Sequence, residues 1–464
     1  MRPIRLGLTQ HNTTRQSLKL LLVVCAMIFA AVPVAADTPA TETAKPASQT
    51  SVANSPNGDA SASKPSAEQA LVIDMRETLD ATQSPAPTPE STIVTEYQDA
   101  IAQIEVRNGA YAPALTEQLL GLGTSLQQLN RHEEALEVLK RGVHLSRINN
   151  GLYSREQIPL LHSEIRSYMA LGDFDAVDQR QRYLYRVERQ ALGDTEDSAK
   201  ALIRQADWQR QAYLLDVGEQ ENQTGRLMIM WDLYRMAFNE FASLYGKNAA
   251  ELRAPLIGML QTQYLFAGHR GFDQYTASES TDIRMLTVTS DTYRRGEAVL
   301  NGILELNIVN GASVTQHVRD TVALGDWAWW FGKEDAALIY YQQARELIPQ
   351  SLDPEGLEDE LFGLPTVLPA LAGIGALPRP DWSDNGLLSV SFTVTEKGRV
   401  DQLEQLRKDE VELDRNGGRL LRALRGTRFR PRFEDGVPVA TEGLVWSWQP
   451  EDWQSSQSMA INQR

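Results

Sequence analysis

Seven arginines stand close together near the end of an otherwise acidic chain. They are Arg415, Arg419, Arg422, Arg425, Arg428, Arg430 and Arg432. No Asp or Glu interrupts residues 415–433. Guanidinium groups form paired hydrogen bonds with carboxylates and phosphates, and the spacing of the first three arginines places them on one helical face. This run therefore predicts a surface that binds an acidic segment of a partner.

A second interpretation of the same run is a helix face exposed to water. Four acidic residues directly precede it, namely Asp409, Glu410, Glu412 and Asp414. These residues could offset the positive charge, and runs of charged residues are usually solvated without any ligand. The sequence leaves both interpretations open.

Other residues that could carry catalysis or bind a metal lack the partners that this chemistry requires. His132-Glu-Glu begins like the zinc-protease motif, but Leu136 occupies the place of the second His. Adjacent glutamates on a helix point in different directions, so they do not form an acid–base pair. The glycines at 121 and 123 lack the preceding strand and the third glycine of a phosphate-binding loop. We therefore predict no catalytic residue, no metal and no cofactor, and a protein that is not an enzyme.

The length and composition are typical of a globular protein with two or three domains. The chain has 464 residues, of which 42% are hydrophobic and 23% are charged, enough for several sizeable cores. Its formal net charge is −16. Because negative charge repels the phosphate backbone, this composition argues against a nucleic-acid partner.

The first 36 residues have the three parts of a secretory signal peptide. The start is basic, through Arg2, Arg5, Arg15 and Lys19. An apolar run over residues 20–34 follows, and the small residues up to Ala36 fit a cleavage site. We expect cleavage after Ala36, which would remove Cys25, the single cysteine, and so exclude disulfides and cysteine chemistry. The alternative is an uncleaved anchor, because the apolar run is near the lower length limit for a membrane span.

Changes in composition divide the rest of the chain into five segments. We expect a disordered Ala/Ser/Thr/Pro-rich tether over residues 37–90, a helical domain over 91–350, a Pro/Gly-rich linker over 351–385, a terminal domain over 386–450 and a tail over 451–464.

Small residues, with larger ones between them, recur at matching positions in the helical domain. The positions are Leu122, Gly123 and Ala135 in one copy, Gly172 in a weaker copy, and Leu324, Gly325, Ala337, Tyr341, Ala344 and Pro349 in the clearest copy. This pattern resembles the tetratricopeptide repeat (TPR), in which small residues let two antiparallel helices approach closely. The resemblance implies an all-α TPR-like solenoid whose groove receives a peptide or a helix of another protein.

Further helix pairs and an aromatic cluster belong to the same region. Helices are expected over residues 198–215 with 225–245, and over 249–267 with 287–306. The cluster consists of Trp327, Trp329, Trp330 and Phe331. We expect these aromatic residues in the core or between repeats, and the alternative is a platform on which a ligand stacks.

The terminal domain is predicted to be a small α+β domain with the order ββαββ. The expected strands are residues 388–394, 399–406, 429–433 and 437–448, with a helix over 416–426 between the second and third strands. Alternating apolar and polar residues indicate the first strand, and glycines mark the turns.

Short motifs in this domain resemble the C-terminal domain of the TonB family. They are Gly398 and Val400 at the first hairpin, Phe429 and Pro431 after the helix, and Gly436 and Pro438 at the last turn. The resemblance covers residues 386–450 and implies a periplasmic module that meets other proteins through an exposed sheet edge. The Tyr-Pro element that commonly precedes the first strand in this family is absent.

Together these features predict an exported, non-catalytic adaptor in the periplasm that binds other envelope proteins or peptides. The alternative is a TonB-type energy transducer that links inner-membrane proton-motive force to outer-membrane transport. That function requires an uncleaved, membrane-anchored N-terminal helix, and membrane contact is expected only in that case. Members of the family carry a His within this helix, and residues 20–36 contain none.

Overall fold

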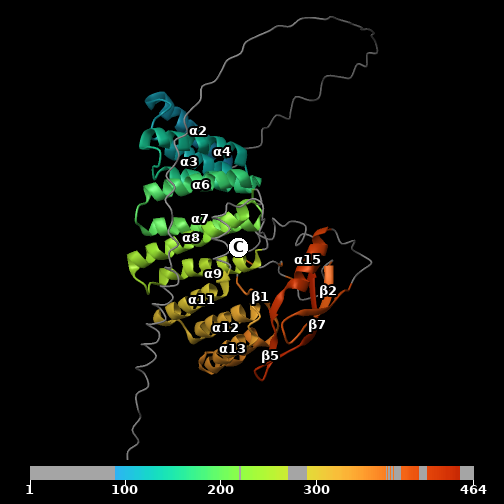
Figure 1. Ribbon diagram of the computed structural model, residues 1–464. Helices are drawn as coiled ribbons and strands as arrows, with labels where there is room; N and C mark the ends of the chain where they lie inside the picture. Colours follow the sequence, from blue (N-terminus) through green and yellow to red (C-terminus); the bar gives the residue numbers. More distant parts are fainter. Residues whose placement is uncertain are drawn as a thin grey trace, which may run out of the picture.

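A stack of helices followed by a small domain of strands and helices makes up the computed structural model (Figure 1). The structure describes residues 89–218, 221–269, 290–371, 374, 377, 380, 388–406 and 415–449. The expected signal peptide, nearly all of the tether and the tail lie outside these residues. Among the described helices, none combines the length and the apolar character needed to cross a membrane.

Successive helices of the stack pack in pairs. The pairs are α3 (Leu115–Gln128) with α4 (His132–Asn150), α5 (Gln157–Leu171) with α6 (Phe174–Ala191), α7 (Glu196–Leu214) with α8 (Glu221–Tyr245), α9 (Arg253–Gly268) with α11 (Thr292–Val309), and α12 (Val314–Trp330) with α13 (Glu334–Leu347). In addition, α2 (Pro89–Asn108) packs on α3, and the short helix η1 (Ala250–Leu252) precedes α9. Each helix mainly contacts its neighbours along the chain, which is the contact pattern of a repeat solenoid.

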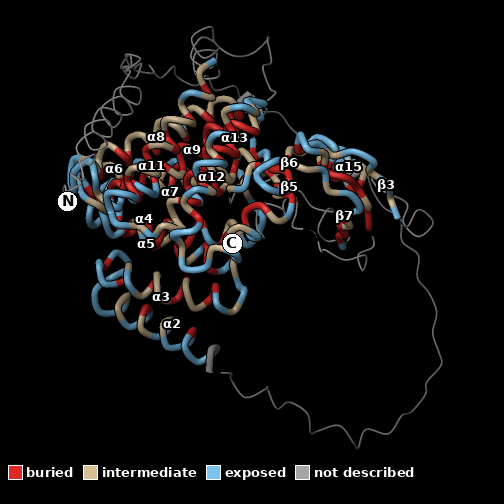
Figure 2. The backbone as a smooth tube through the Cα atoms, turned by 90° about the horizontal axis from the view of Figure 1, so that it is seen from below, coloured by how far each residue is buried: buried red, intermediate tan, exposed pale blue. Residues whose placement is uncertain are grey.

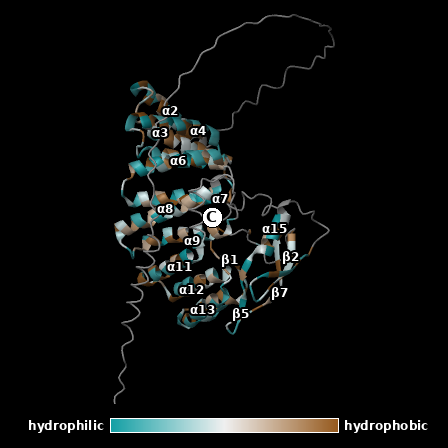
Figure 3. Cartoon of the chain, viewed as in Figure 1, coloured by the Kyte–Doolittle hydropathy of each residue, from teal (hydrophilic) through white to brown (hydrophobic). Residues whose placement is uncertain are grey.

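The core of the stack lies between the helices. Each helix carries both hydrophobic and hydrophilic residues (Figure 3), and the buried residues lie where helices face one another (Figure 2). One buried cluster extends from α2 to α7 and a second from α7 to α12. Trp327 of the aromatic cluster belongs to the second one and is fully buried. An amphipathic helix of this kind is stable only when its neighbours cover its apolar face.

Small residues set the separation of the paired helices. A Cβ atom on Gly123 would lie 2.6 Å from the side chain of Leu139, and one on Gly325 would lie 2.4 Å from the ring of Tyr341. Further repeat positions that are buried are Leu122, Ala135, Leu324, Ala337 and Ala344. Gly172 instead ends α5 with a φ of 73°, and Pro349 lies in the short helix η2 (Ile348–Gln350). The helical region therefore forms a TPR-like repeat stack.

The terminal domain is built on a three-stranded antiparallel sheet. Its central strand is β2 (Leu388–Val394), which pairs with β3 (Val400–Gln405) and with β7 (Thr441–Trp448). The helix α15 (Arg415–Gly426) contributes Leu420 and Leu424 to a core that also contains Phe392 and Trp446. The first strand and the helix agree with the sequence prediction.

The third and fourth expected strands are divided differently from the prediction. β4 (Arg428–Arg430) and β5 (Arg432–Glu434) are separate strands with Pro431 between them, because proline donates no hydrogen bond to a ladder. β5 pairs with β6 (Val437–Val439), and β7 begins only at Thr441. β6 pairs with β5 whereas β7 pairs with β2, and Ala440 between them belongs to neither strand, so the segment 437–448 does not form one strand.

Folded elements also occupy part of the segment that was expected to be a linker. They are α14 (Pro354–Glu358), η3 (Asp359–Gly363) and β1 (Thr366–Leu368). Asp353 caps α14 by accepting a hydrogen bond from the Gly356 amide, and Leu357, Leu361 and Phe362 are buried. β1 pairs with β4 of the terminal domain. This segment therefore joins the two domains through packing as well as through the chain.

Candidate protein-binding surfaces

A buried ion pair connects the helical stack to the terminal domain. Arg430 of β4 donates hydrogen bonds from one Nη1 to both carboxylate oxygens of Asp326 on α12, at 2.9 and 2.8 Å. The two side chains are only 4% and 6% exposed. Tyr341 donates to the same carboxylate, and Arg430 also donates to Thr366. Burial raises the pKa of Asp326, while the ion pair with Arg430 opposes that rise.

Packing around this ion pair extends the interdomain contact. Three aromatic rings, those of Tyr341 (α13), Phe362 (η3) and Phe433 (β5), meet edge to face with centroids 5.3 to 5.9 Å apart. Arg428 donates a hydrogen bond to the carbonyl of Trp329 on α12. Since these contacts are buried and directional, they hold the terminal domain in one place beside the stack.

A cavity opens over this aromatic triad. Its volume is about 1110 Å³, and its walls come from α13, from the segment 348–363 and from the β5–β6 hairpin. We call it the interdomain groove. Figures 1 and 2 both place β5 beside α13, which belongs to the last helix pair of the stack. Ile339 on α13 and Val437 on β6 both line it and are 58% and 60% exposed. The groove therefore presents apolar side chains to solvent.

A tight turn holds one wall of the groove in place. Asp435 and Gly436 both have positive φ, 49° and 82°, as a type I′ two-residue hairpin requires. Arg345 of α13 lies against this turn, because a Cβ on Gly436 would be 2.7 Å from its Nη1. Its Nε also pairs with Glu358 of α14 at 2.8 Å. Arg345 thus connects all three walls of the groove.

The rim of the groove is acidic. Besides Glu358, it contains four carboxylates that make no ion pair within the described residues. They are Glu346, Glu355, Asp359 and Asp435, and all four side chains belong to exposed residues. Arg345 is the one cationic residue among the residues that line the groove, and it is already paired. The groove therefore combines a negative rim with an apolar floor, which consists of the rings of Tyr341, Phe362 and Phe433.

The arginine run does not form one surface. Arg419, Arg422 and Arg425 are exposed along α15. Arg430 faces the stack, Arg428 bonds to Trp329, and Arg432 pairs with Glu434 at 2.7 Å. The side chain of Arg415 lies outside the described residues. Among the described side chains of the run, those of Arg419, Arg422 and Arg425 are thus placed as a partner-binding face would require.

The motif residues of the terminal domain lie at its structural joints. Gly398 has a φ of 66°, and a Cβ there would lie 1.9 Å from the carbonyl oxygen of Phe429. The Phe429 amide in turn donates to the Gly398 carbonyl at 2.9 Å. Val400 opens β3, and Pro438 stands opposite Phe433 in the hairpin. β7 forms one margin of the three-stranded sheet, which is where strand addition was expected.

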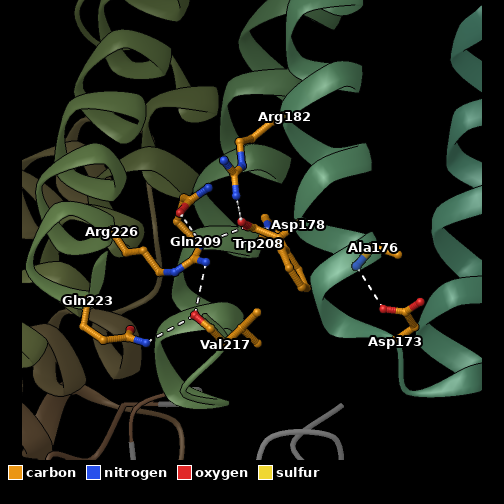
Figure 4. Close-up of polar contacts among 9 residues, drawn as sticks. All are labelled: Asp173, Ala176, Asp178, Arg182, Trp208, Gln209, Val217, Gln223 and Arg226. Atoms are coloured by element: carbon orange, nitrogen blue, oxygen red, sulfur yellow. Dashed lines mark hydrogen bonds and ion pairs between the residues drawn. The ribbon is translucent and has the colours of Figure 1, made fainter. Parts of the chain in front are cut away.

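A buried polar cluster ties α6, α7 and α8 together (Figure 4). Asp178 accepts hydrogen bonds from Trp208 at 2.8 Å and from Arg226 at 2.9 Å, and Arg182 pairs with its other oxygen. Burial would raise the pKa of Asp178, but these hydrogen bonds outweigh it and hold the pKa at about 2. A cavity of about 480 Å³ lies beside the cluster. Because the carboxylate is already saturated with donors, we interpret the cluster as a structural joint.

The described residues contain no group of three or more His, Cys, Asp or Glu side chains that could hold a metal. His132 begins α4, and Gly121 of α3 lies against the ring of Tyr97. Both therefore belong to the repeat framework. Trp329 is as buried as Trp327, and rings of α12 pack on Tyr264 and Tyr341.

Sequence reasoning missed the Asp326–Arg430 pair and the interdomain groove. One signal for the pair was present, since Asp326 is a charged residue between Gly325 and Trp327 in a run of small and aromatic residues. A carboxylate at such a position needs a buried partner. No local signal identifies that partner, which stands 104 positions later.

Comparisons with known proteins show a likeness of fold only. No family model and no curated protein matches the chain. Among solved structures, BtubC (BKLC) from P. vanneervenii matches with a TM-score of 0.35 and 11% identity, over 57% of this chain and 92% of that one. A Podosopora anserina kinesin light chain with nearly identical TPR-like repeats matches with a TM-score of 0.34 and 12% identity, over 51% and 96%. At these scores the likenesses assign no function.

Proposed function

We propose that this protein is a non-catalytic scaffold that binds other proteins, and that the interdomain groove is its principal binding site. The observation that carries this proposal is the presence of two exposed apolar side chains in the groove, Ile339 and Val437, which are open to solvent between two domains that a buried ion pair holds together. Apolar side chains that converge in a concave site are typical anchors for a partner segment. A rigid groove also orders few residues when it binds, which favours affinity.

The proposal includes a location and a class of partner. The signal-peptide pattern of residues 1–36 and the TonB-like motifs support export to the periplasm and binding of envelope proteins. N-terminal sequencing of the protein from its host envelope tests the location. We expect the chain to start at Asp37. Recovery of an intact, membrane-retained Met1 would instead favour an anchored energy transducer.

Quantitative affinity capture tests the binding function. The mature chain and the double variant Ile339→Asp/Val437→Asp serve as baits for envelope proteins, and mass spectrometry compares the recovered partners. The matched control is Ile93→Asp/Val106→Asp, which changes two apolar residues of α2 that are 43% and 87% exposed. We expect specific partners to be lost with the groove variant and kept with the control. Equal recovery by all three baits would contradict the proposed site.

A further inference from the structure

We infer that the interdomain groove takes a basic segment whose apolar side chains anchor it, a partner class that rests on the proposed function. The rim supplies four carboxylates that make no ion pair within the described residues, against one arginine that is already paired. A Lys or Arg of a partner placed beside such a carboxylate is attracted to it. An acidic segment at the same place would be repelled, so the rim selects by charge.

The floor explains why the partner must also carry apolar residues. Ile339 and Val437 are the exposed apolar side chains of the groove, and the rings of Tyr341, Phe362 and Phe433, which also line it, are buried. A volume of about 1110 Å³ accommodates several side chains at once. Water leaves these apolar surfaces only if the partner brings apolar surface of its own. A purely charged segment would satisfy the rim and leave Ile339 and Val437 hydrated.

Side chains, and not strand addition, have to make this contact. Pro438 stands opposite Phe433, one step beyond the turn-closing pair of Glu434 and Val437. At this position the backbone N–H of an ordinary residue would point away from β5, toward the free side of β6. Proline has no N–H, so the margin of β6 lacks the donor that a docked strand needs. The partner segment is therefore amphipathic, with Lys or Arg beside apolar anchors.

A second copy of this chain is a poorer occupant. One exposed basic face among its described residues is that of Arg419, Arg422 and Arg425 on α15. Of the leucines of the same helix, Leu420 and Leu424 are buried in their own domain, and Leu421 packs against the same core. That face would bring charge to the rim but no anchor to the floor. The expected occupant is therefore a basic amphipathic segment of another protein.

Fluorescence anisotropy of labelled synthetic peptides tests this inference on the full mature chain. The probes are a short Lys/Leu amphipathic peptide and a Glu/Leu peptide with leucines at the same positions. We expect wild type to bind the Lys/Leu peptide, and the variant Glu346→Lys/Glu355→Lys to bind it about tenfold more weakly or worse. The matched control, Glu96→Lys/Glu117→Lys, makes the same change of charge at exposed residues of α2 and α3 and should bind like wild type.

Four results would overturn the inference. Equal weakening by both charge-reversal pairs would mean general attraction to an acidic protein. Preference for the Glu/Leu peptide, abolished by Ile339→Asp, would leave the groove as a binding site but with another class of partner. Failure of both peptides to bind would remove the partner class, while the capture experiment would still decide the function. A concentration-dependent dimer in sedimentation, lost in Glu346→Lys/Glu355→Lys, would identify a second copy as the occupant.

Discussion

Arg430 and Asp326 carry charges that solvent hardly reaches, so each depends on the other. Replacing Arg430 with Met would leave the Asp326 carboxylate buried with Tyr341 as its remaining donor. Uncompensated buried charge of this kind costs about 3 to 5 kcal/mol. We therefore expect Arg430→Met to lower the free energy of unfolding by that amount, measured by chemical denaturation. The double variant Asp326→Asn/Arg430→Met should recover part of the loss.

An exposed ion pair supplies the control for this prediction. Arg319 and Glu360 also connect α12 to the segment after α13, but their side chains are 44% and 54% exposed. Because exposed pairs contribute little, Arg319→Met should cost less than about 1 kcal/mol. If Arg430→Met costs no more than Arg319→Met, the buried pair does not hold the domains together.

The lowered pKa of Asp178 predicts how the free energy of unfolding depends on pH. Its pKa of about 2 in the folded chain lies below the ordinary value of 3.8. The carboxylate therefore contributes stability that is present above pH 3.8 and is lost as the pH falls through 2. The contribution is at most about 2 kcal/mol, because Arg182 is largely exposed and solvent weakens its share. Asp178→Asn should thus be less stable than wild type at pH 6, and the difference should shrink between pH 4 and 2.

Denaturation curves at each pH measure this difference. Asp175→Asn is the matched control, since it removes an exposed carboxylate of the same helix that makes no ion pair within the described residues. A constant gap between Asp178→Asn and wild type from pH 6 to pH 2 would show that the carboxylate charge does not stabilise the α6–α8 joint.

Gly398 tests how the β2–β3 turn docks on β4. An alanine there would place its Cβ 1.9 Å from the Phe429 carbonyl, at a φ that L-residues rarely adopt. The conflict is with backbone, which cannot rotate away as a side chain would. We expect Gly398→Ala to destabilise the terminal domain by about 2 kcal/mol or more, because strain and overpacking add. Hydrogen exchange of β2 and β4 amides would report the loss.

A second glycine gives the opposite expectation. A Cβ on Gly418 of α15 would meet nothing within 4 Å. Gly418→Ala should therefore stabilise the helix by about 0.5 to 1 kcal/mol. If both alanine variants have the same effect, the close approach at Gly398 is not what requires glycine there.

The elements that could be predicted are those whose signals are local. The alternation in residues 388–394 indicated β2, and the leucines of residues 416–426 indicated α15. Most helix pairs followed from periodicity in the same way. The division of residues 428–448 into the strands β4 to β7 could not be predicted from local signals, because it depends on which other strand each segment pairs with. β1, the partner of β4, lies in a segment whose prolines and glycines suggested a linker.

The whole molecule gains a property that neither domain has alone. The interdomain groove has one wall on the last helix pair and another on the β5–β6 hairpin, with α14 and η3 between them. A repeat stack ends in an unpaired face that must be covered. Here Phe362 and Phe433 cover part of that face, and the groove lies beside the covered part. Neither the cover nor the groove could be predicted from the separate domains, since both depend on contacts over about a hundred residues of chain.

The most direct test of the scaffold function is photo-crosslinking in the native host. A photoreactive phenylalanine analogue replaces Ile339 in the groove, and Ile93 on α2 serves as the control position. The account predicts a discrete adduct with a partner at position 339 that is absent at position 93, and the crosslinked peptide should carry Lys or Arg beside apolar residues. Absence of any adduct at position 339 above the level at position 93 would contradict the groove as the binding site.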